Sequence, residues 1–176
     1  MEWLLFVFIS LAVAFIFWVA VFVVFPLLMG ASYEVTQDDK MKKMIKFARI
    51  RKGDKVAELG SGNGKLVIEF AKLGAEIHGY EINPFLVLLS KWKINREGLK
   101  EKAFVHWKNF WSVNLGEFDV VLTFQVGYIM NTLEKKLKRE ARKKMRVVSN
   151  NWKFPTLKCL KQEDKVYYYE INSSNK

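Results

Sequence analysis

The sequence predicts an α/β fold, a doubly wound parallel sheet that ends in a C-terminal antiparallel hairpin and is preceded by one N-terminal transmembrane helix. Three observations predict it. From residue 38 onward, segments with strand character alternate with segments of helical periodicity, which is typical of a parallel sheet covered by helices. Two β-rich runs close the chain, and the first 30 residues carry a single charged side chain, Glu2. A chain of 176 residues holds one domain of ordinary size and an appendage.

The first expected element is a membrane span over Trp3–Phe25. This run of 23 residues is interrupted only by Ser10 and would form about 34 Å of helix, enough for a hydrocarbon core of about 30 Å. A signal peptide is the weaker alternative because the run begins with Glu2 instead of positive charge. A buried core helix would have a polar face. We expect residues 1–29 to form the anchor and 30–37 a connector that reaches at most about 28 Å.

The charge distribution indicates on which side of the membrane the domain lies. All 29 Lys and Arg residues and 17 of the 18 Asp and Glu residues follow residue 30. Because Lys and Arg collect on inner flanks of membrane spans, the segment 40–52 places the domain on the cytosolic or equivalent inner (matrix) side, facing an anionic surface. The single cysteine, Cys159, agrees with this side. Nucleic-acid binding is disfavoured because the basic residues are dispersed, and the sequence does not indicate an oligomeric state.

The remaining elements follow from periodicity and turn residues. Asp38 opens a helix whose apolar residues fall at helical spacing, and Val56–Leu59 forms a buried strand. Further helices are expected at 65–73, 84–97 and 129–144, and strands at 76–80, 103–107, 118–124 and 146–150. The last two β-rich runs, 156–162 and 165–171, form the hairpin. The basic side chains of helix 129–144 face either solvent or anionic lipid headgroups.

A glycine-rich turn, "VAELGSGNG" at 56–64, joins the first strand to its helix. Such a turn binds nucleotide ligands at a helix N-terminus. Its glycines, Gly60, Gly62 and Gly64, have GxGxG spacing, and Lys65 stands where a dinucleotide site has its third glycine. Glu58 supplies a carboxylate that attracts an ammonium group. Lys65 in place of the third glycine and Glu58 in a strand position that is usually apolar both favour S-adenosyl-L-methionine over a dinucleotide. No metal site is expected.

Two later segments complete the expected cofactor site. Glu81 ends the second strand in "GYEINP", where a carboxylate accepts hydrogen bonds from both ribose hydroxyls. In "HWKNFW", Asn109 can present its side-chain carbonyl to the adenine amino group, and Phe110 supplies a backbone N–H and an apolar surface beside the ring. These residues point to an adenosine ligand.

Three stretches carry a resemblance to a known family: "AELGSGNGKLVIEFAKLGAEIHGYEINPFLV", "FDVVLTFQVGYIMNTLEKKLKRE" and "RVVSNNWKFP". They resemble the class I methyltransferases, which have a Rossmann-like, seven-stranded sheet. More narrowly, they are similar to small membrane-anchored protein-lysine methyltransferases related to the mitochondrial enzymes acting on the adenine nucleotide translocase and the ATP synthase c subunit. The glycine block is generic, whereas its combination with "NTLEKKL" and "RVVSNNWKFP" is specific.

The resemblance implies that residues 38–176 form a methyltransferase domain. It marks Glu58, Gly60, Gly62 and Gly64 as cofactor-motif residues and Glu81 as the ribose ligand, and Thr36 can reach the cofactor carboxylate from the connector. The full set of residues expected to bind the cofactor is Tyr33, Thr36, Glu58, Gly60, Ser61, Gly62, Gly64, Glu81, Ile82, Asn109 and Phe110. Asn109 departs from the Asp that is common there. The loop "ARKKM" replaces a Pro-Gly turn, and "TFQVG" replaces an "NPPY"-type signature, which argues against methylation of DNA or of glutamine amides.

The acceptor side is expected beyond the fourth and fifth strands. Gln125 and Asn150 each follow or end a parallel strand, where ligands bind in such sheets. Trp152 and Phe154, with Tyr33, are candidates for aromatic walls that suit a cation.

The expected function is therefore membrane-anchored, S-adenosyl-L-methionine-dependent methylation of a lysine in a protein at the membrane. Methylation of a small or lipid molecule such as a quinone, or a basic membrane-tethered RNA-binding module, remain alternatives.

Overall fold

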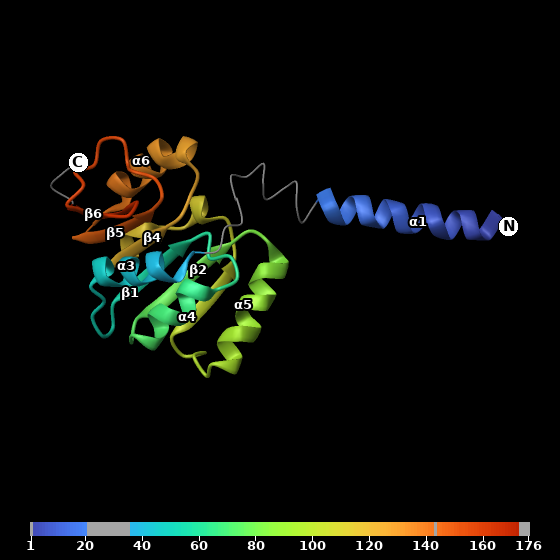
Figure 1. Cartoon of the computed structure of the whole chain (residues 1–176), viewed down its shortest axis with the longest axis horizontal. Helices are drawn as coiled ribbons and strands as arrows, with labels where there is room; N and C mark the ends of the chain where they lie inside the picture. Colours follow the sequence, from blue (N-terminus) through green and yellow to red (C-terminus); the bar gives the residue numbers. More distant parts are fainter. Residues whose placement is uncertain (1, 21–35, 143, 173–176) are drawn as a thin grey trace.

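The computed structural model describes residues 2–20, 36–142 and 144–172 (Figure 1). In chain order the described elements are α1 (Glu2–Val19), α3 (Asp38–Ala48), β1 (Lys55–Leu59), α4 (Lys65–Lys72), β2 (Glu76–Glu81), α5 (Pro84–Arg96), β3 (Ala103–Trp107), η2 (Phe110–Ser112), η3 (Leu115–Glu117), β4 (Val120–Thr123), η4 (Gly127–Ile129), α6 (Met130–Glu140), β5 (Met145–Asn150), β6 (Lys161–Glu163) and β7 (Val166–Ile171).

The seven described strands form one sheet in the order β3-β2-β1-β4-β5-β7-β6. The pairs from β3 to β5 are all parallel, and β7 runs antiparallel between β5 and β6. The expected doubly wound sheet with a terminal antiparallel hairpin is confirmed. Because β1 lies between β2 and β4, the strand order reverses beside β1, and ligands bind outside the carboxyl ends of strands at such a reversal.

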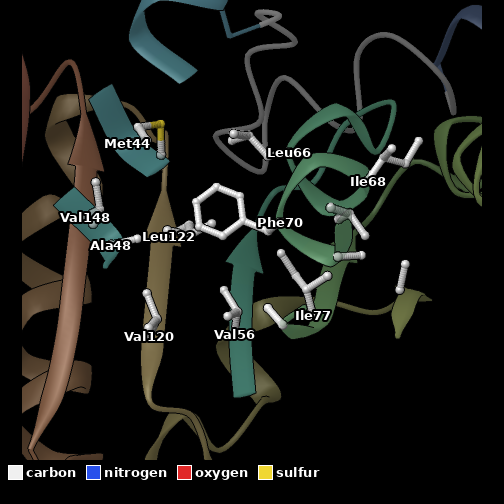
Figure 2. Close-up of a cluster of buried hydrophobic side chains, with 14 of the residues drawn as sticks. Met44, Ala48, Val56, Leu66, Ile68, Phe70, Ile77, Val120, Leu122 and Val148 are labelled. Carbon is white, nitrogen blue, oxygen red and sulfur yellow. The ribbon is translucent and has the colours of Figure 1, made fainter. Parts of the chain in front are cut away.

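Helices cover both faces of the sheet and bury two apolar clusters. Helices α3, α4 and α5 pack on one face, and Figure 2 shows Phe70 of α4 there among Met44 and Ala48 of α3 and the strand residues Val56 and Leu122. Helix α6 buries its apolar stripe in the second cluster, on the other face. Side chains alternate along each strand, so β1, β2, β4, β5 and β7 each contribute to both clusters, whereas β3 contributes to the first cluster alone.

Two expected elements differ from the structure by more than two residues at one end. The helix expected over 129–144 ends at Glu140, because Met145 is fully buried and pairs with Ile171 as the first residue of β5. Met145 follows Leu133, Leu137 and Ala141 at the same four-residue spacing, so the sequence predicts that it continues the helical stripe, and this prediction is wrong. Of the expected strand 156–162, only Lys161 and Gln162 belong to β6, and residues 156–160 form a loop.

The N-terminal segment is described only in part. Helix α1 exposes its apolar side chains, including Leu5, Phe8 and Phe15. Within the described ranges, no helix has the length and apolar character that crossing a membrane requires. The expected span Trp3–Phe25 continues into residues 21–25, and the connector residue Tyr33 follows them; both lie outside the described residues.

Candidate active site

The carboxyl ends of the parallel strands meet at one edge of the sheet, which we call the carboxyl edge. Leu59 at the end of β1 is level with Tyr80 of β2 and with Thr123 at the end of β4. Thr123 is in turn level with Ser149 of β5, so Asn150 lies one residue beyond. The sequence-predicted residues of the glycine turn, Glu81 and Asn150 are thereby brought to one edge.

The glycine turn is fixed by backbone hydrogen bonds to β2. The N–H groups of Gly60 and Ser61 both donate to the carbonyl oxygen of Tyr80, at 2.9 and 3.1 Å. Gly60 has a φ of +77°, which side chains rarely allow. A Cβ atom there would also lie 2.8 Å from Nε2 of Gln125. The backbone conformation therefore favours glycine at this position, and a larger residue would also displace the side-chain amide of Gln125.

Glu81 joins the glycine turn to the turn that follows β2. Its Oε2 atom accepts a hydrogen bond from the N–H of Gly62 at 2.9 Å, and its Oε1 atom accepts one from the N–H of Asn83 at 2.8 Å. Between them, the carbonyl oxygen of Ile82 accepts a hydrogen bond from Nε1 of Trp107 at 3.0 Å. A carboxylate offers about four lone-pair sites, so the buried Glu81 retains acceptor capacity for a ligand.

Glu58 is a buried carboxyl group beside the glycine turn. It receives a backbone hydrogen bond from Val67 in the first turn of α4, and its Oε2 atom has no partner among the described residues. Burial, together with the negative charge of Glu81, holds the pKa of Glu58 well above its ordinary value. A cation bound at Oε2 would favour the ionised form of Glu58 and lower this pKa.

The carboxyl edge gathers polar atoms that lack partners. In the described part of the chain, six buried side-chain atoms have no hydrogen-bond partner, and five of them lie at this edge. They are Oε2 of Glu58, Oγ of Ser61, Oγ1 of Thr123, and both amide atoms of Asn150. Because buried polar atoms in folded proteins are nearly always paired, such a concentration marks a site that a polar ligand completes.

Gln125 and Trp152 border these atoms. Nε2 of Gln125 donates to the carbonyl oxygen of Leu59 at 2.6 Å, so its carbonyl oxygen is the group left to accept a hydrogen bond. The indole ring of Trp152 lies against Gly127, where a Cβ atom would come within 2.8 Å of it. Oγ of Ser149 donates to the carbonyl oxygen of Trp152 at 2.6 Å and fixes that loop to β5. The half-exposed Trp152 is therefore held beside the carboxyl edge.

Other predicted residues are placed differently. Phe154 is buried in the core on the α6 side of the sheet, where its ring meets that of Tyr169 at 5.1 Å, so it packs the core and is not part of an open wall. The side-chain carbonyl of Asn109 accepts from the N–H of Trp111 at 3.0 Å and caps η2. Phe110 follows it and is half-buried.

Thr36 lies at the point where the connector meets the domain. The Thr36 side chain is buried, and its carbonyl oxygen accepts a hydrogen bond from Nζ of Lys65 at 2.9 Å. Nζ of Lys65 also lies 2.6 Å from the carboxylate of Asp38. Lys65, the residue in place of the dinucleotide glycine, thus fastens the connector to the N-terminus of α4.

Sequence reasoning missed three residues on the helices that support this site. On α5, Oγ of the fully buried Ser90 donates a hydrogen bond to the carbonyl oxygen of Gly62 at 3.0 Å and so holds the glycine turn against α5. On α6, Lys136 is buried, although a solvent- or lipid-facing side chain was expected. Its Nζ donates to the carbonyl oxygens of Trp111 and Val113, at 3.0 and 2.7 Å, and to Glu140 at 2.8 Å. Lys136 thereby holds the segment that follows Asn109.

The third missed residue is Glu134, also on α6, which holds the loop after β5. Its buried carboxylate accepts hydrogen bonds from the N–H groups of Thr156 and Leu157, at 2.9 and 3.2 Å, from the Thr156 hydroxyl, and from Nζ of Lys138 at 2.8 Å. Burial raises the pKa of Glu134, but these hydrogen bonds outweigh burial and lower it overall. The "NTLEKKL" motif contains both Glu134 and Lys136, and their spacing gave no signal that they face inward.

Solved structures show the same fold. An RNA methyltransferase from Salinibacter ruber, solved in complex with S-adenosyl-L-homocysteine, superposes with a TM-score of 0.76 over 80% of this chain and 95% of its own, at 23% identity. A precorrin-6y C5,15-methyltransferase from Geobacter metallireducens covers 77% of this chain and 88% of its own with a TM-score of 0.59 and 15% identity. At these identities the likeness concerns the fold alone.

Two relatives with similar sequences are both named as lysine N-methyltransferases. The human lysine N-methyltransferase of the ATP synthase c subunit is 37% identical over 116 residues, which are 66% of this chain and 49% of the human protein. The mouse adenine nucleotide translocase lysine N-methyltransferase is 30% identical over 154 residues, covering 85% of this chain and 67% of the mouse protein. The chain thus spans about half the length of the human relative.

The match to a family profile includes the glycine turn, Glu81, the "NTLEKKL" motif and the end of β5. The profile of the ANTKMT methyltransferase domain matches residues 58–161, from the buried Glu58 to the first residue of β6. With the carboxyl-edge site and the fold in agreement, the chain belongs to the family of ANTKMT methyltransferase domains.

Proposed function

We propose that this protein is a membrane-tethered, S-adenosyl-L-methionine-dependent protein-lysine N-methyltransferase whose substrate is a membrane protein or a protein docked at the membrane. The observation that carries the proposal is the cluster of unpartnered buried polar atoms at the carboxyl edge, next to the glycine turn. The family and the names of its characterised relatives agree with this chemistry.

The residues present fit the cofactor. Glu81 has lone pairs left for two ribose hydroxyls, and the unpartnered Oε2 atom of Glu58 suits the ammonium of the amino-acid portion. Phe110, on a loop that Lys136 holds in place, provides an apolar surface for adenine. When bound, the cofactor supplies an electrophilic methyl group on a sulfonium sulfur.

The acceptor side must present a neutral amine. Deprotonating a lysine with a pKa of about 10.4 costs about 4–5 kcal/mol at pH 7, and a dry site lowers that cost by disfavouring the ammonium. Asn150 is fully buried, and the oxygens of Asn150, Thr123 and Gln125 can accept hydrogen bonds from the amine and orient its lone pair. The site thus needs acceptors and positioning, and no strong base is required.

Membrane tethering is part of the proposal and rests on the exposed apolar side chains of α1 and on the hydropathy of residues 3–25. The basic segment 40–52 favours a domain on the cytosolic or matrix side. The names of the relatives make the ATP synthase c subunit and the adenine nucleotide translocase the first candidate substrates to examine.

A methyl-transfer assay tests the function. Membranes from cells that lack this protein are incubated with radiolabelled S-adenosyl-L-methionine and the purified full chain, and label is followed on protein bands and in the lipid extract. We expect label on a protein band, released as methylated lysine after hydrolysis. Glu81→Ala should reduce labelling about a hundredfold, because the proposed acceptor of both ribose hydroxyls is lost together with the hydrogen bonds that hold the two turns.

Glu101→Ala is the matched control, since Glu101 is an exposed acidic residue in the turn before β3. It should label like the unmodified protein. Label in the lipid extract alone would support a small-molecule substrate instead, and label that persists with Glu81→Ala would contradict the proposed cofactor site.

A further inference from the structure

Helix α5 exposes an apolar stripe that the catalytic site does not use. Phe85, Leu88 and Trp92 stand at helical spacing and are 63, 67 and 53% exposed. Trp107, at the end of the neighbouring strand β3, is 68% exposed. We call these four side chains the α5 patch. Contiguous exposed aromatic and aliphatic side chains of this kind mark a surface that binds a partner or a membrane.

The α5 patch is bordered by cations. Helix α5 contains Lys91, Lys93 and Arg96 and no acidic residue. The guanidinium of Arg96 lies over the ring of Trp92, 4.8 Å from its centre, and leaves a positive charge at the patch. Burial lowers the pKa of His106 on β3 most, and the positive charges of Lys91 and Lys108, which lie near β3, contribute to lowering it. Exposed Trp, Phe and Leu beside Lys and Arg are the composition of helices that lie in the headgroup region of anionic membranes.

The α5 patch is also rigid. The side-chain oxygen of Asn83 accepts hydrogen bonds from the N–H groups of Phe85 and Leu86, at 3.0 and 3.4 Å, and fixes the start of α5. The hydrogen bond from Trp107 to Ile82 holds that indole beside the same turn. The backbone at the start of α5 and the Trp107 indole are therefore ordered before any contact, which lowers the conformational entropy lost on binding.

The place of the α5 patch in the fold relates it to the proposed tether. Helix α5 begins directly after Glu81, so Phe85 and Trp107 lie at the carboxyl edge. The connector reaches the domain at the same edge, where Lys65 holds Thr36. In Figure 1, α5 is the helix coloured light green at the outer side of α4, along the β3 side of the sheet. The tether and the site thus share the carboxyl edge, and the α5 patch begins at this edge and continues along α5 to Trp92.

We propose that the α5 patch inserts into the headgroup region of an anionic bilayer and presents the carboxyl edge to that membrane. This inference rests on the proposed function in one respect, the membrane location of the chain. It adds the orientation of the domain, since α1 alone would leave the domain free to rotate about the connector. Lipid is favoured over a protein partner because the cations surround apolar side chains on one rigid face.

Site-specific fluorescence tests the orientation in the full chain. Cys159→Ser removes the single cysteine, and a polarity-sensitive NBD label is attached at Leu88→Cys or, as the matched control, at Leu73→Cys. Leu73 is an exposed leucine that follows α4 at the opposite edge of the sheet. The labelled proteins are mixed with vesicles of phosphatidylcholine and phosphatidylglycerol that carry a shallow, lipid-attached doxyl quencher.

We expect the label at Leu88 to shift to shorter wavelength and to be quenched, and the label at Leu73 to do neither. Equal responses of the two labels on vesicle-bound protein overturn the inference. A shift at Leu88 that needs no vesicles and grows with protein concentration assigns the patch to a second copy of the chain and also overturns it.

Activity gives a second, independent reading. The triple variant Phe85→Ser, Leu88→Ser, Trp92→Ser should methylate a substrate in vesicles at least about tenfold more slowly than the unmodified chain, and the same substrate in detergent at an unchanged rate. Equal loss in both media would contradict membrane docking by the patch. The two proposals fail in different measurements. If the proposed function is wrong, the unmodified chain transfers no methyl group to a protein in detergent. The fluorescence of the label at Leu88 tests membrane docking independently of methyl transfer.

Discussion

At the residue scale, the two carboxyl groups of the site have different surroundings. Glu81 is held by two backbone N–H groups, whereas Glu58 has one backbone donor and an oxygen atom without a described partner. Burial and the charge of Glu81 therefore make the ionised form of Glu58 unfavourable. If Glu58 binds the cofactor as proposed, it does so at a cost to the stability of the fold, as residues at functional sites often do.

Replacing Glu58 by Gln should separate these two effects. The raised pKa means that Glu58 favours the folded state fully below its ordinary pKa of 4.5 and loses this contribution as the pH rises through the raised pKa. Glu58→Gln should therefore be more stable than the unmodified protein at pH 7 and equally stable below about pH 4. Thermal unfolding across this pH range measures the difference.

The same variant should bind S-adenosyl-L-homocysteine at least about tenfold more weakly by calorimetry, because a buried charge pair is lost. Glu101→Gln serves as the control and should change neither property. A Glu58→Gln protein that is less stable at pH 7 would contradict the assignment of a strained carboxylate.

At the scale of the element, α6 supports both sides of the site. Lys136 donates to the backbone carbonyls of Trp111 in η2 and of Val113 directly after it, on the proposed adenine side. Glu134 accepts from the backbone N–H groups of Thr156 and Leu157, on the proposed acceptor side. Two residues apart on one helix, they fix two loops that are distant in sequence. Although most charged residues of α6 are basic, Lys136 and Glu134 are buried and stabilise these two loops.

Glu134→Ala should loosen the acceptor-side loop. Loss of the carboxylate leaves two backbone N–H groups without their acceptor, so the free energy of unfolding in urea should fall by about 2–4 kcal/mol. Hydrogen exchange at Thr156 and Leu157 should accelerate. Because the pKa of Glu134 is lowered, its contribution is present above the ordinary pKa of 4.5 and lost as the pH falls through the lowered value.

The control for this variant is Lys135→Ala, an exposed residue on the same helix, whose effect should stay within about 0.5 kcal/mol. If the two variants lose equal stability, the Glu134 hydrogen bonds do not stabilise the fold, and the role assigned to α6 is wrong.

Local signals in the sequence predicted much of the fold. The strands and the glycine turn were predictable because apolar runs and a residue with positive φ, such as Gly60, leave a pattern within a few residues. Met145 misled the helix prediction because its spacing fits a helix, while its pairing with Ile171 decides its structure. Ser90, Lys136 and Glu134 support the site through partners 22 to 28 residues away, which no local pattern encodes. Phe154 and Trp152 are both aromatic residues of one loop, and only the packing of Phe154 on Tyr169 distinguishes them.

At the scale of the whole molecule, the proposed tether predicts how the protein leaves a membrane. The full chain should stay in the membrane pellet after washes with high salt and with alkaline carbonate, because apolar side chains and not charges hold it. Leu11→Lys combined with Phe15→Lys should move it to the supernatant, since each lysine at the centre of a span costs about 2.5–3.5 kcal/mol.

Leu73→Lys is the control, because Leu73 is an exposed leucine of the domain, and this variant should remain in the pellet. Release of the unmodified chain by high salt alone would show peripheral, electrostatic binding and would contradict a hydrophobic anchor.

The hydrogen bond from Lys65 to Thr36 limits how far the active site of the proposed enzyme can lie from the bilayer surface. Because Thr36 is fastened to the domain, only residues 30–35 separate the end of the proposed anchor from the carboxyl edge. Six residues span at most about 20 Å. The length of this segment would then select the substrate lysines. The enzyme would methylate lysines within about this distance of the bilayer surface and would not reach identical lysines farther out. Lengthening this segment should extend the range of lysines that are methylated without any change in the site itself.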